Sequence, residues 1–377
     1  MDSNFGQVHH ERIDSIRSQI IACLEENRVG FGYSAAANGS DLLFLGAVEQ
    51  RDGESHIVLP MGKELFVHVS VAGDSIHDWE KEFEQAMDRA AHVMVVNEFS
   101  RTDDPLQFEY ANQVMAGLAM LHASALGATI VPIAVFDGKP ARGPGGTGSL
   151  VESWRQMGWT PHIIHPPNNP EKSSVSNMKL DSVSNDVCES TSSSSCEVRK
   201  EIRAMLFADV VGYSKITEEE IPLFVREFMS RIANCVSTSG IRLETCNTWG
   251  DAIFFVFRNV EDAGLTALQI TELVSSIDWK TRGFERQLNL RTGLHVDPVY
   301  RLIDPITRTW THTGAHVSRA ARIEPIAPAG EVYVSEAFAA VAATENVSSF
   351  RCDYVGVTPM AKGYGDFPTY HVRRVKS

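Results

Sequence analysis

The chain has 377 residues, with 34 Lys and Arg against 48 Asp and Glu, and a formal net charge of −14 at pH 7. This acidic balance, without a basic stripe, argues against nucleic acid as the main partner. No apolar stretch approaches the roughly 20 residues that a membrane helix needs, and the N-terminus lacks a secretory pattern, so we expect a soluble, cytoplasmic protein with no membrane partner.

The length predicts two domains. Residues 166–198 are rich in Ser and Asn and poor in large apolar side chains, which predicts a flexible linker. We therefore expect an N-terminal domain over residues 1–165 and a C-terminal domain over residues 199–377. The six cysteines show no CxxC spacing and no histidine cluster beside them, so they do not indicate a zinc site.

The N-terminal domain alternates helical and extended patterns. We expect helices over residues 12–26, 79–90 and 108–126, and a further helix that is capped within residues 38–41 and runs to residue 50. Between and after them we expect a strand over 29–33 and extended runs over 56–59, 92–96 and 129–136. This alternation predicts an α/β domain, a Rossmann-like arrangement with a mostly parallel sheet between helices.

Small residues fill the segment from Gly30 to Asp41, which places a strand, a loop and a helix N-terminus in succession. Free N–H groups at such a terminus favour an anionic or nucleotide ligand, although close packing explains small residues equally well. The stretch Ser34–Asp41, with His56–Pro60, is similar to SLOG-type Rossmannoid domains. That resemblance implies a nucleotide-like ligand and a regulatory role, with the glycine-rich loop Gly143–Gly148 closing over the same pocket.

The C-terminal domain follows a different pattern. We expect a strand over 203–207, a helix over 218–237, strands over 241–246 and 252–257 joined by a turn at 248–250, a helix over 260–277, a strand over 288–295, a helix over 314–323 and a strand over 331–334. This order predicts an α+β sheet with helices packed on one face.

Two acidic residues adjoin apolar strands in this domain. Asp209 ends the first strand and precedes a small-residue turn, and Asp251 lies at the tip of the predicted hairpin. Backbone N–H groups in such a turn can bind phosphate oxygens, and two carboxylates can share two divalent ions that activate a hydroxyl and hold a triphosphate. Either aspartate alone is better explained as a turn or cap residue.

Taken together, the two segments resemble the paired metal-binding aspartates of class III nucleotidyl cyclases. Further matches to that family follow in order: Arg291–His295 resembles its RxGLHxG strand, Gly314–Arg322 its GxxVNxAAR helix, Gly330–Ser335 the strand that follows, and Ala361–Gly365 its closing lysine-glycine segment. Asp297 stands where a second glycine is frequent. The resemblance implies a ferredoxin-like α+β fold that converts a nucleoside triphosphate to a 3′,5′-cyclic monophosphate.

The same resemblance implies roles for individual residues. Asp209 and Asp251 would bind two Mn²⁺ or Mg²⁺ ions, joined by the Val210 carbonyl. Arg322 would stabilise charge on the transferred phosphoryl group, and Lys362 would contact the triphosphate unless it is a solvated surface lysine. The substrate would also contact Phe207, Val211, Gly212 and Tyr213.

Three positions depart from the family. Ser318 stands where the family has a transition-state asparagine, and Asn247 and Thr311 stand where adenylyl cyclases place Lys and Asp. An Asn amide can match the edge of uracil or guanine or, flipped, adenine, so Asn247 does not choose the base by itself.

The Thr248–Asp251 turn, the segment 294–300 and the helix end at 322–325 resemble bacterial cyclases that include the pyrimidine cyclases of Pycsar anti-phage systems. This implies UTP as substrate, cyclic UMP as a defence messenger, and a separate effector that reads it. Because class III sites form between two catalytic domains and this chain has one, we expect a homodimer.

Two other interpretations stay open: an ATP or GTP cyclase in ordinary signalling, and a cyclase-like module that regulates without catalysis. Retention of Asp209, Asp251 and Arg322 speaks against the second, because two close carboxylates repel each other without metal. The N-terminal domain shows no activated nucleophile that would make it the enzyme instead.

Overall fold

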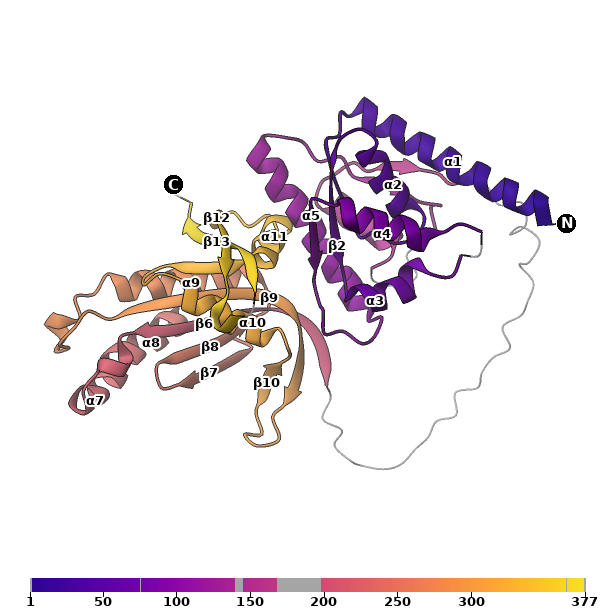
Figure 1. Cartoon of the computed structure of the whole chain (residues 1–377). Coiled ribbons are helices and arrows are strands. Elements are labelled where there is room, and N and C mark those ends of the chain that lie inside the picture. Colours follow the sequence, from indigo (N-terminus) through magenta and orange to yellow (C-terminus); the bar gives the residue numbers. More distant parts are fainter. Residues whose placement is uncertain (1, 75, 140–144, 168–197, 364, 376–377) are drawn as a thin grey trace, which may run out of the picture. The chain divides into compact units, whose positions relative to one another are not determined.

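The computed structural model describes residues 2–74, 76–139, 145–167, 198–363 and 365–375 (Figure 1). Most of the predicted linker lies outside these ranges, as do Gly143 and Pro144 of the glycine-rich loop, so their flexibility stays a prediction. None of the helices within the described ranges combines the length and apolar composition that crossing a bilayer requires.

The first part of the chain alternates helices with short strands. Its elements are α1 (Asp2–Glu26), β1 (Phe31–Ser34), α2 (Ser40–Glu49), β2 (Glu54–Leu59), α3 (Lys63–Phe66), the π-helix η1 (Val67–Val71), α4 (Trp79–Arg89), β3 (His92–Val95), α5 (Pro105–Leu126), β4 (Ile133–Val135), α6 (Thr147–Gln156) and β5 (His162–Ile164). Helix α5 has a complete set of end signals: Asp104 accepts a hydrogen bond from the Leu106 N–H, Pro105 begins the helix, and Gly127 ends it with φ 64°.

These strands pair in two sheets. One has three strands in the order β1-β2-β3, with β1 parallel to β2, and the other pairs β4 with β5 in parallel. Parallel pairing fits the alternation with helices, so an α/β arrangement is present, while the Rossmann-like assignment stays a prediction. Sequence patterns missed α6 and β5, and α1 begins at Asp2 rather than Arg12.

The second part contains most of the β-structure. Its elements are β6 (Arg199–Val211), the 3₁₀ turns η3 (Tyr213–Lys215) and η4 (Glu218–Glu220), α7 (Ile221–Leu223), the π-helix η5 (Phe224–Met229), α8 (Ser230–Thr238), β7 (Thr245–Trp249), β8 (Ala252–Phe257), α9 (Val260–Ser275), η6 (Lys280–Arg282), β9 (Asn289–Ile303), β10 (Trp310–Thr313), α10 (Val317–Ile323), η7 (Glu324–Ile326), β11 (Val332–Ser335), α11 (Glu336–Thr344), β12 (Phe350–Pro359), η8 (Ala361–Gly363) and β13 (Asp366–Arg374).

One eight-stranded sheet organises this part. Its order is β12-β13-β11-β9-β6-β8-β7, and β10 pairs with the C-terminal end of β9, residues 300–303. Within the described residues, β9 and β11 pair in parallel and the other strand pairs of this sheet are antiparallel. This mixed sheet with helices is the expected α+β architecture.

Several predicted boundaries in this part were wrong. The strand expected over 241–246 begins at Thr245 and continues to Trp249, because Trp249 pairs with Ala252 and only two residues, Gly250 and Asp251, make the turn. Gly250 has φ 67°, the left-handed conformation that such a turn requires.

The single helix expected over 218–237 is divided into η4, α7, η5 and α8. Pro222 lies in the first turn of α7, where its missing N–H is tolerated, so regular helix starts there and not before. Helix α10 begins at Val317 rather than Gly314, and β9 runs on to Ile303 because it keeps pairing with β6 and β10. Patterns also missed β10, α11, β12 and β13.

One face of β6 and β9 lies beneath α10 (Figure 1). Side chains alternate along a strand, so Met205, Phe207 and Asp209 share a face of β6. Met205 packs with Ala320 of α10 in a buried cluster, and Phe207 borders that cluster. The face that carries Asp209 is therefore the face that α10 covers.

Strand β9 continues this face. The residues opposite Asp209, Phe207, Met205 and Arg203 are, in order, Arg291, Gly293, His295 and Asp297. A Cβ at Gly293 would lie 2.5 Å from the backbone nitrogen of Glu324, so η7 rests directly on the strand. Because Gly293 has no side chain, η7 can approach β9 closely enough for Glu324 to lie beside Arg291 and near Asp209.

The chain divides by its contacts into two compact units, and their boundary does not follow the linker. One unit contains residues 58–66, 93–130 and the described residues from 198 onward; the other contains the rest. Helix α5 thus belongs to the unit of the eight-stranded sheet, and it packs on α11. A Cβ at Gly117 of α5 would lie 2.0 Å from the carbonyl oxygen of Ala340, and the Tyr110 hydroxyl donates to the carbonyl of Val296 at 2.7 Å.

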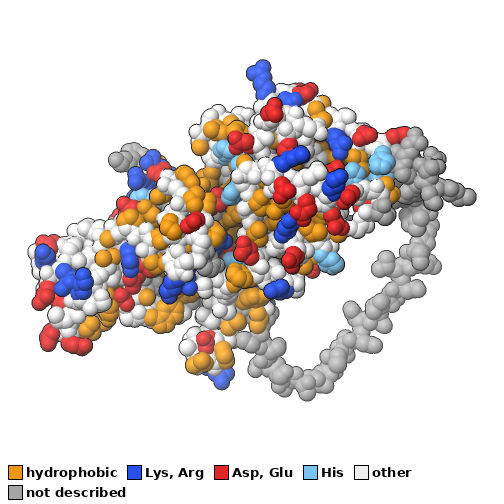
Figure 2. All heavy atoms as spheres, in the orientation of Figure 1, with side chains coloured by type: hydrophobic (Ala, Val, Ile, Leu, Met, Phe, Trp, Pro, Cys, Tyr) orange, Lys and Arg blue, Asp and Glu red, His pale blue; other side chains and the backbone are white. Residues whose placement is uncertain are grey.

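The visible surface mixes side-chain types. Figure 2 shows acidic, basic and hydrophobic side chains interspersed over the face in view. Large exposed apolar groups include Trp249 at the β7–β8 turn and Ile306 and Trp310 at the β9–β10 hairpin.

Candidate active site

Two carboxylates meet at one end of the eight-stranded sheet. The β6–β8 pairing reaches Ala208 and Ile253, so Asp209 and Asp251 both lie just past its last pair. Burial, and then the charge of Asp209, raise the pKa of Asp251. The two aspartates that the sequence singled out are therefore neighbours that repel each other when both are ionised.

A third carboxylate and an arginine complete this group. Arg291 Nη2 donates to Asp209 Oδ2 at 2.7 Å, and Arg291 Nε lies 3.0 Å from Glu324 Oε1, although that pair is misaligned for a hydrogen bond. Burial raises the pKa of Glu324 to about 7; Arg291 opposes this rise, and Asp209 and Asp251 add to it. Three carboxylates around one guanidinium leave an excess of negative charge, which favours cations.

Neither Glu324 nor Arg291 had been given a role from the sequence. Arg291 stood in a recognised motif, and its position opposite Asp209 follows once the β6–β9 register is known. Glu324 gave no local signal, because its place depends on the close approach of η7 to Gly293.

The turn after Asp209 has the geometry expected of small residues. Gly212 has φ 88°, and η3 follows it directly. The Tyr213 ring packs 4.9 Å from that of Phe224. Val211 still pairs with Asn289 and the Val210 side chain is buried, so the strand holds this turn in place.

Phe207, which was predicted to contact substrate, packs against other side chains of the catalytic unit. Its ring lies 4.6 Å from that of Phe254 and borders the cluster under α10. The packing explains its position without a ligand.

The two positions expected to read the base lie on strands that are not paired with each other in the sheet but are linked by a side-chain hydrogen bond. Asn247 is on β7 and Thr311 is on β10. Thr245 Oγ1 and His312 Nδ1 are hydrogen-bonded at 2.8 Å, which ties the two strands together beside both residues.

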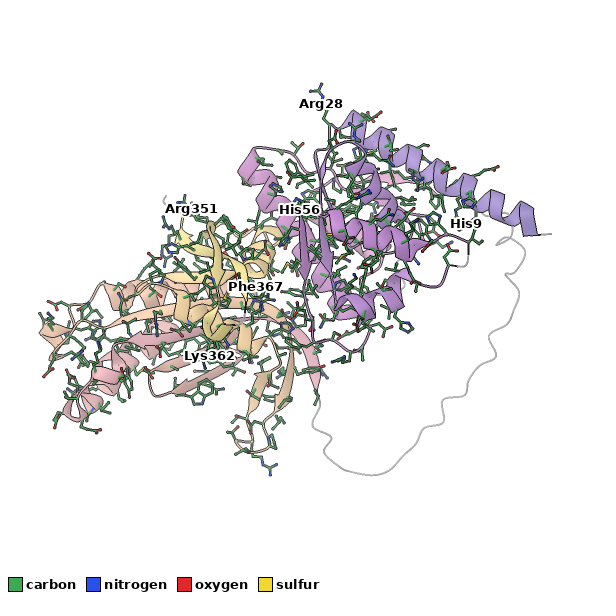
Figure 3. The ribbon with its side chains drawn as sticks, viewed as in Figure 1. His9, Arg28, His56, Arg351, Lys362 and Phe367 are labelled. Carbon is green, nitrogen blue, oxygen red and sulfur yellow. The ribbon has the colours of Figure 1, made fainter. Side chains whose placement is uncertain are left out.

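Ser318 and Arg322 lie four residues apart on α10, so they project from one side of the helix. Ser318 is exposed, whereas Arg322 is half-buried and its Nε has no hydrogen-bond partner in the described structure. Lys362, labelled in Figure 3, is exposed on η8 with φ 62°. Among the described residues, no hydrogen bond or ion pair joins these three side chains to Asp209 or Asp251.

A half-buried acid in the first turn of α2, Asp41, bonds to the small-residue loop of the N-terminal part. Asp41 Oδ2 accepts a hydrogen bond from the Ala37 N–H at 3.2 Å, and burial raises the pKa of Asp41 to about 6, against opposing bonds from Ala37 and Ser34. The Asp41 carboxylate therefore stabilises the loop by accepting from its backbone, and it places an acidic group in the first turn of α2.

Residues 197–374 match the family model described as the adenylate and guanylate cyclase catalytic domain. No curated protein is significantly similar to the chain in sequence.

Similar solved structures include the guanylate cyclase domain of RhGC from Catenaria anguillulae in complex with GTP, at 20% identity over 47% of this chain and 100% of that one, with a TM-score of 0.40. The adenylyl cyclase CyaB from P. aeruginosa is 15% identical over 48% and 97% of the two chains, with a TM-score of 0.42. A non-canonical dimeric guanylyl cyclase domain from the RhoGC fusion protein of Blastocladiella emersonii is 22% identical over 47% and 99%, with a TM-score of 0.39.

Proposed function

We propose that this protein, whose residues 197–374 are an adenylate and guanylate cyclase catalytic domain, makes cyclic UMP from UTP. In this reaction the 3′ oxygen bonds to the α-phosphorus while the bond from that phosphorus to the leaving diphosphate breaks. The observation that supports the cyclase activity is the meeting of Asp209, near the end of β6, with Asp251 in the β7–β8 turn, where the β6–β8 pairing ends beside a glycine turn.

Asp209, Asp251 and the Val210 carbonyl would hold two Mg²⁺ or Mn²⁺ ions. Their oxygens are the donors that these hard ions prefer, and the raised pKa of Asp251 reflects a repulsion that a dication would relieve. When bound, such ions supply charge neutralisation at the triphosphate and a lowered pKa for the attacking hydroxyl. Arg291, bonded to Asp209, moderates the charge of the group before the ions arrive.

The phosphates would lie over the turn at Val211–Tyr213, with Lys362 as a further point charge and Phe207 shaping the wall. Ser318 and Arg322 would complete the site from the second copy of a homodimer, where Arg322 meets charge developing on the α-phosphoryl group.

Complementation tests the shared site. Asp209→Asn and Arg322→Ala should each be inactive alone, and an equimolar mixture should recover about a quarter of the wild-type rate, because half of the dimers are mixed and each has one intact site. A mixture of Asp209→Asn with Asp251→Asn damages the same side of both sites and should stay inactive. A monomeric, active enzyme would refute the homodimer.

For the base, the support is indirect. Asn247 offers one donor and one acceptor edge, and Thr311 offers a short hydroxyl where adenylyl cyclases place Asp, so the pair lacks the charges that adenine-selective relatives use. The likeness of the Thr248–Asp251 turn to pyrimidine cyclases favours UTP. On this basis the product would serve anti-phage defence through a separate effector, and an ATP or GTP cyclase of ordinary signalling is the alternative.

The decisive assay incubates the purified full chain with Mn²⁺ and each of ATP, GTP, CTP and UTP, and identifies products by mass spectrometry. Asp209→Asn should abolish the product, whereas Asp278→Asn, an isosteric change at an exposed turn that caps Lys280, should not. Cyclic UMP from UTP alone supports the proposal. Cyclic AMP or GMP would overturn the base assignment, and binding without any product would favour a regulatory module.

The N-terminal domain would bind a nucleotide-like regulator at the Ser34–Asp41 loop. Asp41→Asn keeps an acceptor for the Ala37 N–H but removes the buried negative charge, so it should tighten binding of an anionic nucleotide there. Unchanged thermal shifts with nucleotides, measured in the Asp209→Asn background, would contradict the idea.

A further inference from the structure

Three metal-ligating side chains converge in the interior of the catalytic unit, away from the aspartates. His295 and Asp297 lie on the face of β9 that α10 covers, and His316 immediately precedes α10, at its N-cap position. Their exposed fractions are 0%, 1% and 4%. Imidazoles and a carboxylate at this depth need partners, because an unpaired buried polar group is costly.

The expected partners are absent within the described structure. His295 Nε2 and His316 Nδ1 each lie 3.3 Å from Asp297 Oδ2, yet neither pair is aligned as a hydrogen bond, and both Asp297 oxygens and both His316 nitrogens lack a hydrogen-bond partner. The ligand atoms of the three residues all lie within 4.8 Å of one another.

Tetrahedral coordination explains this spacing. Around an ion with bonds of about 2.0 Å, neighbouring ligand atoms are about 3.3 Å apart, which matches both measured separations. The two 3.3 Å contacts are misaligned for hydrogen bonds, but their length equals the distance between two ligand atoms bound to one tetrahedral ion.

The second contact of His295 fixes its ring in a suitable orientation. His295 Nδ1 lies 2.7 Å from Ser335 Oγ, which also accepts from the Phe338 N–H at 3.1 Å. When Nδ1 donates to that hydroxyl, the lone pair of Nε2 faces Asp297. Metal-binding histidines are commonly held in this way through the other ring nitrogen.

Nearby cations do not satisfy Asp297. Arg319 and Lys200 both act on its charge, but each has another partner: Arg319 stacks on the Phe367 ring at 4.5 Å, and Lys200 donates to Asp104 at 2.9 Å. Burial raises the pKa of Asp297 well above its usual range and lowers that of His316 to about 4, because the interior disfavours the charged form of each side chain.

We propose that His295, Asp297 and His316 bind one Zn²⁺ ion that fastens the start of α10 to β9. Two imidazoles and one carboxylate are an established zinc donor set, and a water molecule or the Gln107 side-chain oxygen would take the fourth position. Gln107 is fully buried on α5, neither of its amide atoms has a partner, and it lies one turn from Tyr110, which bonds to Val296 between the two β9 ligands.

The ion would be structural. Phe99 lies beside His316, with the two ring centroids 6.0 Å apart. By holding His316, the N-cap residue of α10, the ion would set the position of this short helix, and Arg322 in its last turn would move with it. Loss of the ion is then expected to lower both stability and any activity that depends on Arg322.

A second group of similar composition serves as the control. Glu201, Glu244 and His312 also lie close together, but Arg203 bonds to both glutamates and His312 bonds to Thr245. Because the negative charge there is already paired, that group should not hold a metal.

The test uses the full chain carrying Asp209→Asn and Asp251→Asn, which removes the strand-end carboxylates as a competing site. We expect about one zinc per chain after dialysis, measured by plasma mass spectrometry, and a visible d–d spectrum typical of tetrahedral Co²⁺ when stripped protein is titrated with cobalt. His316→Asn and Asp297→Asn in this background should lose both signals, whereas His312→Gln should retain them.

Failure of the variants to fold does not remove the test, because the cobalt spectrum and a rise in melting temperature on adding zinc are measured on the parent protein. A chain that purifies without zinc and gives neither a tetrahedral cobalt spectrum nor a thermal shift would overturn the proposal. Zinc lost with His312→Gln but kept with His316→Asn would equally refute it, by placing the ion in the other group.

Discussion

The crossing of α5 over α11 gives a sharp prediction about which parts of the chain fold together. At Gly117 an added Cβ would lie 2.0 Å from the carbonyl oxygen of Ala340 and 2.4 Å from its carbonyl carbon. Real Cβ atoms do not approach backbone atoms this closely, so Gly117→Ala must push the helices apart by more than 1 Å or bend them.

Two opposing effects set the magnitude. Replacing glycine by alanine inside a helix is by itself worth about 1 kcal/mol of stability. Overpacking a well-packed contact costs about 1–3 kcal/mol, and a clash with backbone, which has no rotamer to change, belongs at the upper end. We therefore expect Gly117→Ala to lower the free energy of unfolding by about 2 kcal/mol.

Gly46 of α2 is the matched control. It is also helical, but a Cβ there would meet nothing within 4 Å, so Gly46→Ala should raise stability by about 0.5–1 kcal/mol. Urea unfolding followed by circular dichroism measures both, together with cyclase activity. A neutral or stabilising Gly117→Ala would show that α5 does not pack on α11 as described.

Three further predictions follow from the site and its support. Glu324→Gln should reduce the pH dependence of stability, because burial raises the folded pKa of Glu324 to about 7, above its usual value of 4.5. Ionising Glu324 in the folded state therefore costs stability as pH rises from about 4.5 to 7, by about 2 kcal/mol once its partial exposure is allowed for. In urea titrations with EDTA, the loss of stability between pH 5 and pH 8 should be smaller in the variant than in the wild type by about that amount, and an equal loss in both would refute the reasoning. Gly293→Ala would place a Cβ 2.5 Å from the Glu324 nitrogen and should reduce product formation by about tenfold or more, and full activity would refute the close approach of η7. Tyr110→Phe leaves the Val296 carbonyl without its 2.7 Å donor and should cost about 1–3 kcal/mol in thermal unfolding, with no change expected if water reaches that carbonyl.

The domain boundary illustrates a limit of sequence patterns. Composition locates the Ser-rich segment, because poor hydrophobicity is a local property. It does not show that α5, far from that segment in the chain, packs on α11 and belongs to the catalytic unit. A fragment beginning at residue 199 would expose the α11 surface that surrounds Ala340, so loss of activity on truncation would not by itself indicate a regulatory domain.

The sequence by itself determined the strand-end aspartates, the glycine turn after Asp209 and the order of the cyclase motifs, because chain direction, turn geometry and side-chain chemistry are local. Only the tertiary structure decided which distant groups meet. The β6–β9 register sets Arg291 opposite Asp209, the missing Cβ of Gly293 admits Glu324, and α10 carries His316 to His295 and Asp297. Alternation along a strand tells which residues share a face, but the helix that covers that face is chosen by packing across the whole unit.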